Sequence, residues 1–139
     1  MNERKGGVFS IAAENAPVEG CTVSKAVAEV AGRRISHFAL AAETDISPET
    51  YNYHKLWIVV DGAGDVLAAK NAKIAKGDAF VTPIGAPVGI KTDTGIVYTE
   101  IETGKEHRMK LKNFAFAKNG AHWVRAEKPF KMALLLTLD

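Results

Sequence analysis

The chain has 139 residues, of which 47% are hydrophobic and 24% are charged, a composition typical of a globular protein rather than a disordered or fibrous one. Its 18 basic and 16 acidic residues are interspersed and give a net charge of +2, so the sequence predicts neither a nucleic-acid partner nor a membrane surface. The length favours one domain, because domains commonly run to roughly 100–150 residues.

The N-terminal region carries no targeting signal that we recognise. Residues 1–7 are partly basic but are not followed by the apolar stretch of a signal peptide, and no apolar run approaches the ~20 residues of a membrane span. A single cysteine, Cys21, excludes an intrachain disulfide and a thiolate metal cluster, and we expect it to be a buried or half-buried, inert thiol. These features predict a cytoplasmic protein.

The first half of the chain predicts strands. Residues 21–40 alternate loosely between apolar and polar, which indicates strands interrupted near residues 31–33; a helix over residues 23–31 is the alternative, because Ala, Lys and Glu are good helix formers. Residues 53–60 form a β-branched and aromatic run typical of a strand. The Asp-Gly-Ala-Gly sequence at residues 61–64 predicts a hairpin turn after it.

The remaining elements follow at short intervals. Residues 76–78 predict a second turn and residues 79–82 a short strand, whereas the prolines and glycines of residues 83–89 are too dense for a helix or a central strand. Strand signals then recur, at residues 89–94, 96–101, 114–116 and 130–138. Turn signals every 8–12 residues or so are typical of a β-sandwich or barrel, so we predict an all-β fold.

Two stretches, residues 53–64 and 74–88, resemble the conserved motifs of the cupins. In that family a strand ending in a glycine turn is followed by a Gly-Asp turn, here Gly77-Asp78, and then by a Pro-x-Gly loop, here Pro83-Ile84-Gly85. The resemblance covers roughly residues 8–102. It implies a cupin-type jelly-roll barrel, also called a double-stranded β-helix, as a single domain.

The resemblance also implies where the family's metal ligands would stand. The family pattern has two His residues and a Glu before the turn glycine, and a third His after the Pro-x-Gly loop. Counting back from Gly62 places Lys55 at the Glu position and Tyr51 and Glu49 at or near the two His positions, while Val88 stands at the last His position. No complete ligand set remains, and we therefore expect no metal and no cofactor.

The direction of the side chains before Gly62 decides what faces the cavity. Side chains alternate along a strand, so Tyr53, Lys55 and Trp57 are expected to face the interior and His54 to point away, with an apolar outer face formed by Leu56, Ile58 and Val60. That outer face needs a cover, and a small jelly roll has exposed strand edges, so we predict a homodimer.

Lys55 among aromatic residues suggests a ligand pocket. With Tyr51, Tyr53 and Trp57 it would suit a small organic ligand such as a carboxylate or a sugar-like molecule. Desolvation would lower the pKa of a lysine there, and such a lysine can act as a base or nucleophile. The alternative is that Lys55 lies at a wet rim or pairs with Glu49 or Glu100.

The C-terminal part, residues 105–139, resembles the closing half of a second cupin repeat, with His122 at a ligand position. The first half of such a repeat is absent, so the chain looks like a relative of two-barrel cupins with a truncated second barrel. We expect one cupin-like barrel over residues 1–139, in which residues 1–104 form the main core and the strands of residues 105–139 complete that barrel or swap between barrels.

The sequence is compatible with three functions. The first is a cupin that binds a small molecule, as an accessory or sensor protein, with ligand-binding candidates Tyr51, Tyr53, Lys55, Trp57, Glu100 and His122. The second is a metal-dependent enzyme of the isomerase or dioxygenase type that uses His122 with Glu100. The third is a structural interaction module. The other histidines, His37, His54 and His107, lack the short spacing of a metal site and are expected to be hydrogen-bonded structural residues.

Overall fold

The computed structural model describes residues 7–30, 33–102 and 126–129. The chain falls into two compact units, Met1–Met109 and Lys110–Asp139. The fold described below is that of the first unit, and of the second unit the structure describes only residues 126–129, which are exposed. The predicted strands at residues 114–116 and 130–138, as well as His107 and His122, lie outside the described residues, so the arrangement predicted for residues 105–139 stays a prediction.

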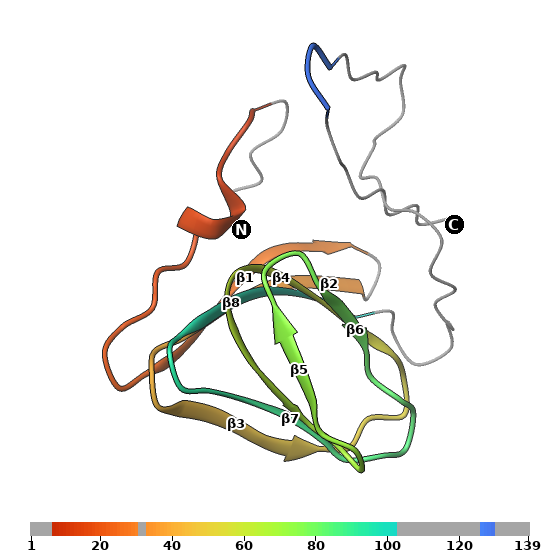
Figure 1. Cartoon of the computed structure of the whole chain (residues 1–139). Coiled ribbons are helices and arrows are strands. Elements are labelled where there is room, and N and C mark those ends of the chain that lie inside the picture. The colour runs from red at the N-terminus through yellow and green to blue at the C-terminus, as the bar shows by residue number, and fades with distance from the viewer. Residues whose placement is uncertain (1–6, 31–32, 103–125, 130–139) are drawn as a thin grey trace. The chain divides into compact units, whose positions relative to one another are not determined.

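The first unit is built from antiparallel strands, which confirms the all-β prediction. A short 3-10 helix, η1 (Ile11–Ala13), precedes the strands. The strands in chain order, shown in Figure 1, are β1 (Thr22–Val30), β2 (Arg33–Leu40), β3 (Thr44–Glu49), β4 (Lys55–Leu67), β5 (Ala72–Ala75), β6 (Ala79–Val81), β7 (Val88–Thr92) and β8 (Ile96–Glu102).

Strand β4 connects the two halves of the sheet. The strand order is β1-β2-β8-β4-β7-β3, and β5 and β6 also pair with β4. The first part of β4 pairs with β8 and β6, whereas residues 63–67 pair with β5 and β7. The sheet therefore curls along β4, and its two halves face each other across one core (Figure 1).

The hairpin predicted at residues 61–64 is wrong, because β4 bends there instead of reversing. Its pairing with β8 shifts register between Val59 and Asp61, and Gly62 has a φ of 73°. A Cβ atom at Gly62 would lie 2.2 Å from the carbonyl oxygen of Gly95, so only glycine fits. A bulge with a glycine in this conformation increases the local twist, and it carries the strand from one half of the sheet to the other.

Most other strand predictions are confirmed. The segment 22–30 is a strand rather than the alternative helix, and the turn at residues 76–78 is closed by Asp78, whose backbone N–H donates to the Ala75 carbonyl at 2.9 Å. No local pattern predicted β3, an edge strand that contains Pro48 and, among the described strands, pairs only with β7. Proline is tolerated there because an edge strand leaves one row of N–H groups unpaired.

The expectation of a buried thiol is also wrong. Cys21 is exposed, because it lies in the turn that leads into β1, where its backbone N–H donates to the Val18 carbonyl at 2.9 Å. A turn outside the curled sheet does not bury its side chains, whatever their hydrophobicity.

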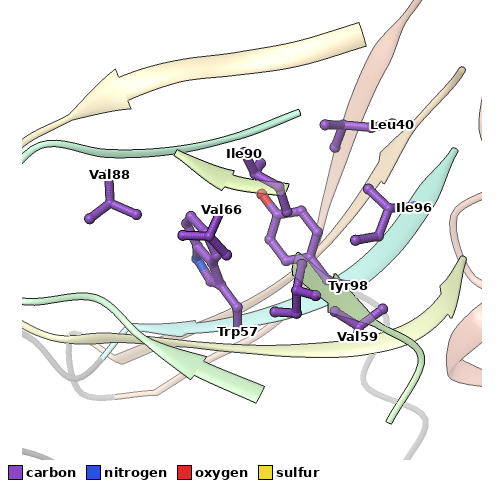
Figure 2. Close-up of a cluster of buried hydrophobic side chains, with 9 residues drawn as sticks. Leu40, Trp57, Val59, Val66, Val88, Ile90, Ile96 and Tyr98 are labelled. Atoms are coloured by element: carbon purple, nitrogen blue, oxygen red, sulfur yellow. The ribbon is translucent and has the colours of Figure 1, made fainter. Parts of the chain in front are cut away.

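The core fills the space between the two halves of the sheet. Figure 2 shows its aromatic and β-branched side chains, with the rings of Trp57 and Tyr98 side by side, their centroids 5.4 Å apart. Phe38 stacks on Tyr98 at 5.1 Å. The hydrophobic core cluster of buried residues consists of Leu40, Trp57, Val59, Val66, Ile74, Val88, Ile90, Ile96 and Tyr98.

Candidate functional site

A cavity of about 60 Å³ lies next to this core. At roughly 10–15 Å³ per water molecule it has room for on the order of five waters, or for a ligand of similar size. Its lining combines aromatic, aliphatic and charged side chains: Phe38, Ile46, Glu49, Tyr51, Lys55, Trp57, Val88, Gly89, Tyr98 and Glu100. All four positions that the cupin resemblance assigns to metal ligands are in this lining, so the structure brings those positions together at one cavity.

Alternation along β4 determines which of its side chains reach the cavity. Lys55 and Trp57 line it, whereas Leu56 is fully buried on the other face of the strand. His54 is not in the lining, and its Nδ1 lies 2.8 Å from the carbonyl oxygen of Thr82. The predicted inward direction of the lysine and the tryptophan, and the outward direction of the histidine, are therefore observed.

A buried ion pair forms the polar centre of the site. Lys55 Nζ lies 3.0 Å from Glu100 Oε1, and Trp57 Nε1 donates to Glu100 Oε2 at 2.7 Å. The side chains of Lys55 and Glu100 are only 7% and 5% exposed. Lys55 Nζ also lies 3.8 Å from Glu102 Oε1. Of the alternatives for Lys55, pairing with Glu100 is therefore observed, and a wet rim is wrong.

The strand register explains this pairing. Trp57 lies directly opposite Glu100 and Lys55 opposite Glu102 in the β4–β8 ladder. Diagonal neighbours on one face of an antiparallel pair lie within reach of long side chains. The lysine therefore extends diagonally to Glu100, which places one carboxylate between a cation and an indole N–H.

Two tyrosines extend the site beyond β4. Lys55 Nζ lies 3.6 Å from the centroid of the Tyr51 ring, close enough for a cation–π contact. The Tyr51 hydroxyl donates to Glu49 Oε2. Tyr53 packs against Tyr51 with a centroid distance of 5.5 Å, but it does not line the cavity. The structure thus groups Tyr51, Lys55, Trp57 and Glu100 at the cavity, whereas the expectation that Tyr53 also faces it is wrong.

The electrostatics of the pair contradict the predicted activated lysine. Burial lowers the pKa of Lys55, but the charge of Glu100 and hydrogen bonds with Glu100 and Tyr51 outweigh it, so the pKa lies above its ordinary value. Burial raises the pKa of Glu100, and the opposing contributions of Lys55 and Trp57 do not cancel this effect. A pKa above the ordinary value favours the protonated ammonium, which makes Lys55 a poor base or nucleophile at neutral pH.

The residues at the family's ligand positions do not fit a metal ion. The Val88 side chain has no atom that could coordinate a metal. The Lys55 ammonium donates hydrogen bonds but has no lone pair to offer a metal. Glu49 and Tyr51 alone offer oxygen atoms. Within residues 7–30, 33–102 and 126–129, no group of three or more His, Cys, Asp or Glu side chains could hold a metal. The metal-enzyme hypothesis that pairs His122 with Glu100 is untested, because His122 lies outside the described residues.

Several lining residues were not predicted. Tyr98 lies two positions before Glu100 on β8, and the same alternation that placed Trp57 inward would have found it. Phe38 and Ile46 gave no local signal of a site, and Ile46 belongs to β3, a strand that was not predicted. The described residues include no helix long and apolar enough to cross a membrane.

The class of fold defined by this curled sheet and its central cavity is a jelly-roll barrel, and comparisons with solved structures narrow it further. A cupin superfamily protein from Desulfitobacterium hafniense superposes with a TM-score of 0.68 at 18% identity, over 73% of this chain and 94% of that one. A conserved protein of unknown function from Streptococcus pyogenes superposes with a TM-score of 0.67 at 14% identity, over 73% and 90%. No family model and no curated protein matches the sequence.

A third structure is an enzyme. Salicylate 1,2-dioxygenase from Pseudoaminobacter salicylatoxidans superposes with a TM-score of 0.54 at 23% identity, over 63% of this chain and 28% of that one. At these identities the superpositions establish the fold alone. The chain therefore has the cupin fold, as the resemblance of its two motifs implied.

Proposed function

We propose that this protein is a metal-independent cupin that binds a small organic molecule in the cavity lined by Tyr51, Lys55, Trp57 and Glu100, as an accessory or sensor protein. One observation carries the proposal. The positions that resemble the family's metal ligands meet at a cavity, and a protonated lysine occupies the place of the carboxylate ligand. Such a site keeps the shape of a binding cavity but offers a ligand hydrogen bonds and aromatic faces instead of coordination.

The lining supports recognition of an organic molecule. Trp57 and Tyr98 offer aromatic surface, and Val88 adds an aliphatic wall. Lys55 and Glu100 hold each other in place, so the polar groups at the centre are fixed before any ligand arrives. A preorganised site loses less conformational entropy on binding.

A fragment screen with and without chelator tests this function. The protein would be dialysed against EDTA, and a library of small organic fragments would be screened by thermal shift and by the NMR signal of the Trp57 indole N–H. We expect hits whose affinity is unchanged by EDTA. A requirement for added metal, or stoichiometric iron, manganese, zinc or nickel that is lost in a His122→Ala variant, would refute metal independence.

A matched pair of variants assigns the hits to the cavity. Val88→Phe places a ring inside the cavity and is expected to abolish binding, whereas Ile84→Phe adds the same ring in a loop where residue 84 is 41% exposed. Circular dichroism would show that both variants fold. Binding that survives Val88→Phe would place the ligand elsewhere.

A further inference from the structure

The charges at this cavity are unequal. Two carboxylates, those of Glu49 and Glu100, line it against the single ammonium of Lys55, while Glu102 lies beside Lys55 and directly opposite Arg34 in the β2–β8 ladder. Both Glu100 and Glu102 already oppose that ammonium, at 3.0 Å and 3.8 Å. Glu49, which is exposed to solvent, also lines the cavity, and among the described residues it accepts a hydrogen bond from Tyr51 but forms no ion pair. The cavity therefore keeps a negative charge that the chain's described cations do not neutralise.

This excess exists while Glu100 is ionised, because Lys55 then pairs with Glu100 and the charge of Glu49 is left over. The same carboxylates act on the Tyr98 hydroxyl: burial raises the pKa of Tyr98, and the charges of Glu100 and Glu49 raise it further. An anion entering the cavity would therefore be repelled while Glu100 is ionised.

The uncharged part of the lining also favours a cation. The rings of Phe38, Trp57 and Tyr98 border the cavity, and the faces of aromatic rings carry partial negative charge. Ile46 and Val88 complete an apolar wall that suits a short hydrocarbon chain. The cavity thus combines an acidic group at Glu49 with aromatic and aliphatic surface.

We infer that the cavity selects a small organic cation, a primary ammonium compound with a short apolar chain, whose ammonium group pairs with Glu49. This inference rests on the proposed function and narrows it to one class of ligand. It also argues against the carboxylate ligand expected from the sequence, because a carboxylate would have to displace Glu100 from Lys55. The volume of about 60 Å³ has room for a ligand group of a handful of non-hydrogen atoms.

Three probes of similar size and different charge test the inference: propylammonium, propan-1-ol and propionate. Each would be titrated into the full-length protein at constant ionic strength, and binding would be followed by the Trp57 indole N–H signal, assigned with a Trp57→Phe variant. We expect propylammonium to bind about tenfold more tightly than propan-1-ol, which corresponds to about 1.4 kcal/mol, and propionate to bind more weakly than either.

Glu49→Gln provides the decisive variant. Glutamine keeps a hydrogen-bond acceptor for Tyr51 but removes the charge, so the preference for propylammonium over propan-1-ol should disappear. Glu19→Gln is the control, because Glu19 is an exposed residue outside the cavity lining, and it should keep the tenfold preference.

The outcomes separate this inference from the function on which it rests. Propionate or propan-1-ol binding as tightly as propylammonium would overturn the inference and leave the proposed small-molecule site supported. A preference that persists in Glu49→Gln would overturn the role of Glu49. If none of the three probes binds, the inferred ligand class is wrong, and the fragment screen decides separately whether the cavity binds any small molecule.

Discussion

Replacing Lys55 by methionine removes the cation from the buried pair and leaves the Glu100 carboxylate without it. The two side chains are 7% and 5% exposed and their charged atoms are 3.0 Å apart, so solvent screens the interaction little. Breaking a buried pair by removing one partner costs about 3–5 kcal/mol. Because small domains unfold at a cost of only about 5–15 kcal/mol, the Lys55→Met variant should lose a large fraction of its stability.

A double-mutant cycle isolates the pair. The free energy of unfolding would be measured by urea titration, followed by circular dichroism, for the native protein, Lys55→Met, Glu100→Gln and the double variant. The amide oxygen introduced by Glu100→Gln can still accept the hydrogen bond from Trp57, so the second change removes charge without orphaning the indole N–H. We expect the double variant to be about 2 kcal/mol more stable than the sum of the two single losses predicts.

The control is a lysine in an exposed ion pair. Lys76 Nζ lies 3.6 Å from Asp61, and these side chains are 71% and 61% exposed. Lys76→Met should therefore change stability by no more than about 0.5 kcal/mol. A loss for Lys55→Met as small as that of the control, or strictly additive losses in the cycle, would refute a buried and coupled pair of Lys55 and Glu100.

Three further predictions concern the bend of β4 at Gly62, the stability of the protein at alkaline pH and its oligomeric state. Gly62→Ala should cost about 3 kcal/mol or more in urea unfolding, because the new Cβ atom would lie 2.2 Å from the Gly95 oxygen at a φ of 73°. Gly77→Ala, with a φ of 92° but open space around it, should cost only about 1 kcal/mol, and equal losses would contradict the close approach. Burial lowers the pKa of Lys55 but Glu100 raises it more, so its folded-state pKa exceeds the unfolded value. Its stabilisation is therefore complete below about pH 10.4 and is lost as the pH rises through the higher folded-state pKa. Urea unfolding across that range should show this decline in the native protein and less of it in Lys55→Met. The predicted homodimer should appear in light scattering at micromolar concentration, and a monomer would contradict it.

Patterns within a few consecutive residues were enough to predict several of the strands. Alternation and glycine turns identified β1, β2, β7 and β8, because their side chains alternate between the two faces of one curled sheet. The bend of β4 could not be predicted in this way. The Asp-Gly-Ala-Gly sequence favours a reversal of the chain. It forms a bulge instead because Gly62 packs against Gly95, more than thirty positions later in the sequence.

The candidate site was likewise predictable only where the signal is local. The alternation before Gly62 correctly placed Lys55 and Trp57 inward, since strand geometry fixes the direction of consecutive side chains. The predicted sign of the pKa shift of Lys55 was wrong, because the shift depends on which carboxylate of the neighbouring strand the lysine reaches. That partner, Glu100, lies 45 positions away and is identified by the β4–β8 register rather than by any local motif.

The buried lysine explains why the cavity would select its ligand by charge rather than by coordination. From one point Lys55 contacts Glu100, Glu102 and the ring of Tyr51, the kind of convergent contact that a bound cation makes. Unlike a bound ion it is part of the chain, and as an ammonium it offers a ligand no vacant coordination position. On the proposed function, binding would then come from the groups that Lys55 does not neutralise. Since Glu49 is the lining carboxylate that Lys55 does not pair with among the described contacts, the charge of Glu49 should determine which molecules bind.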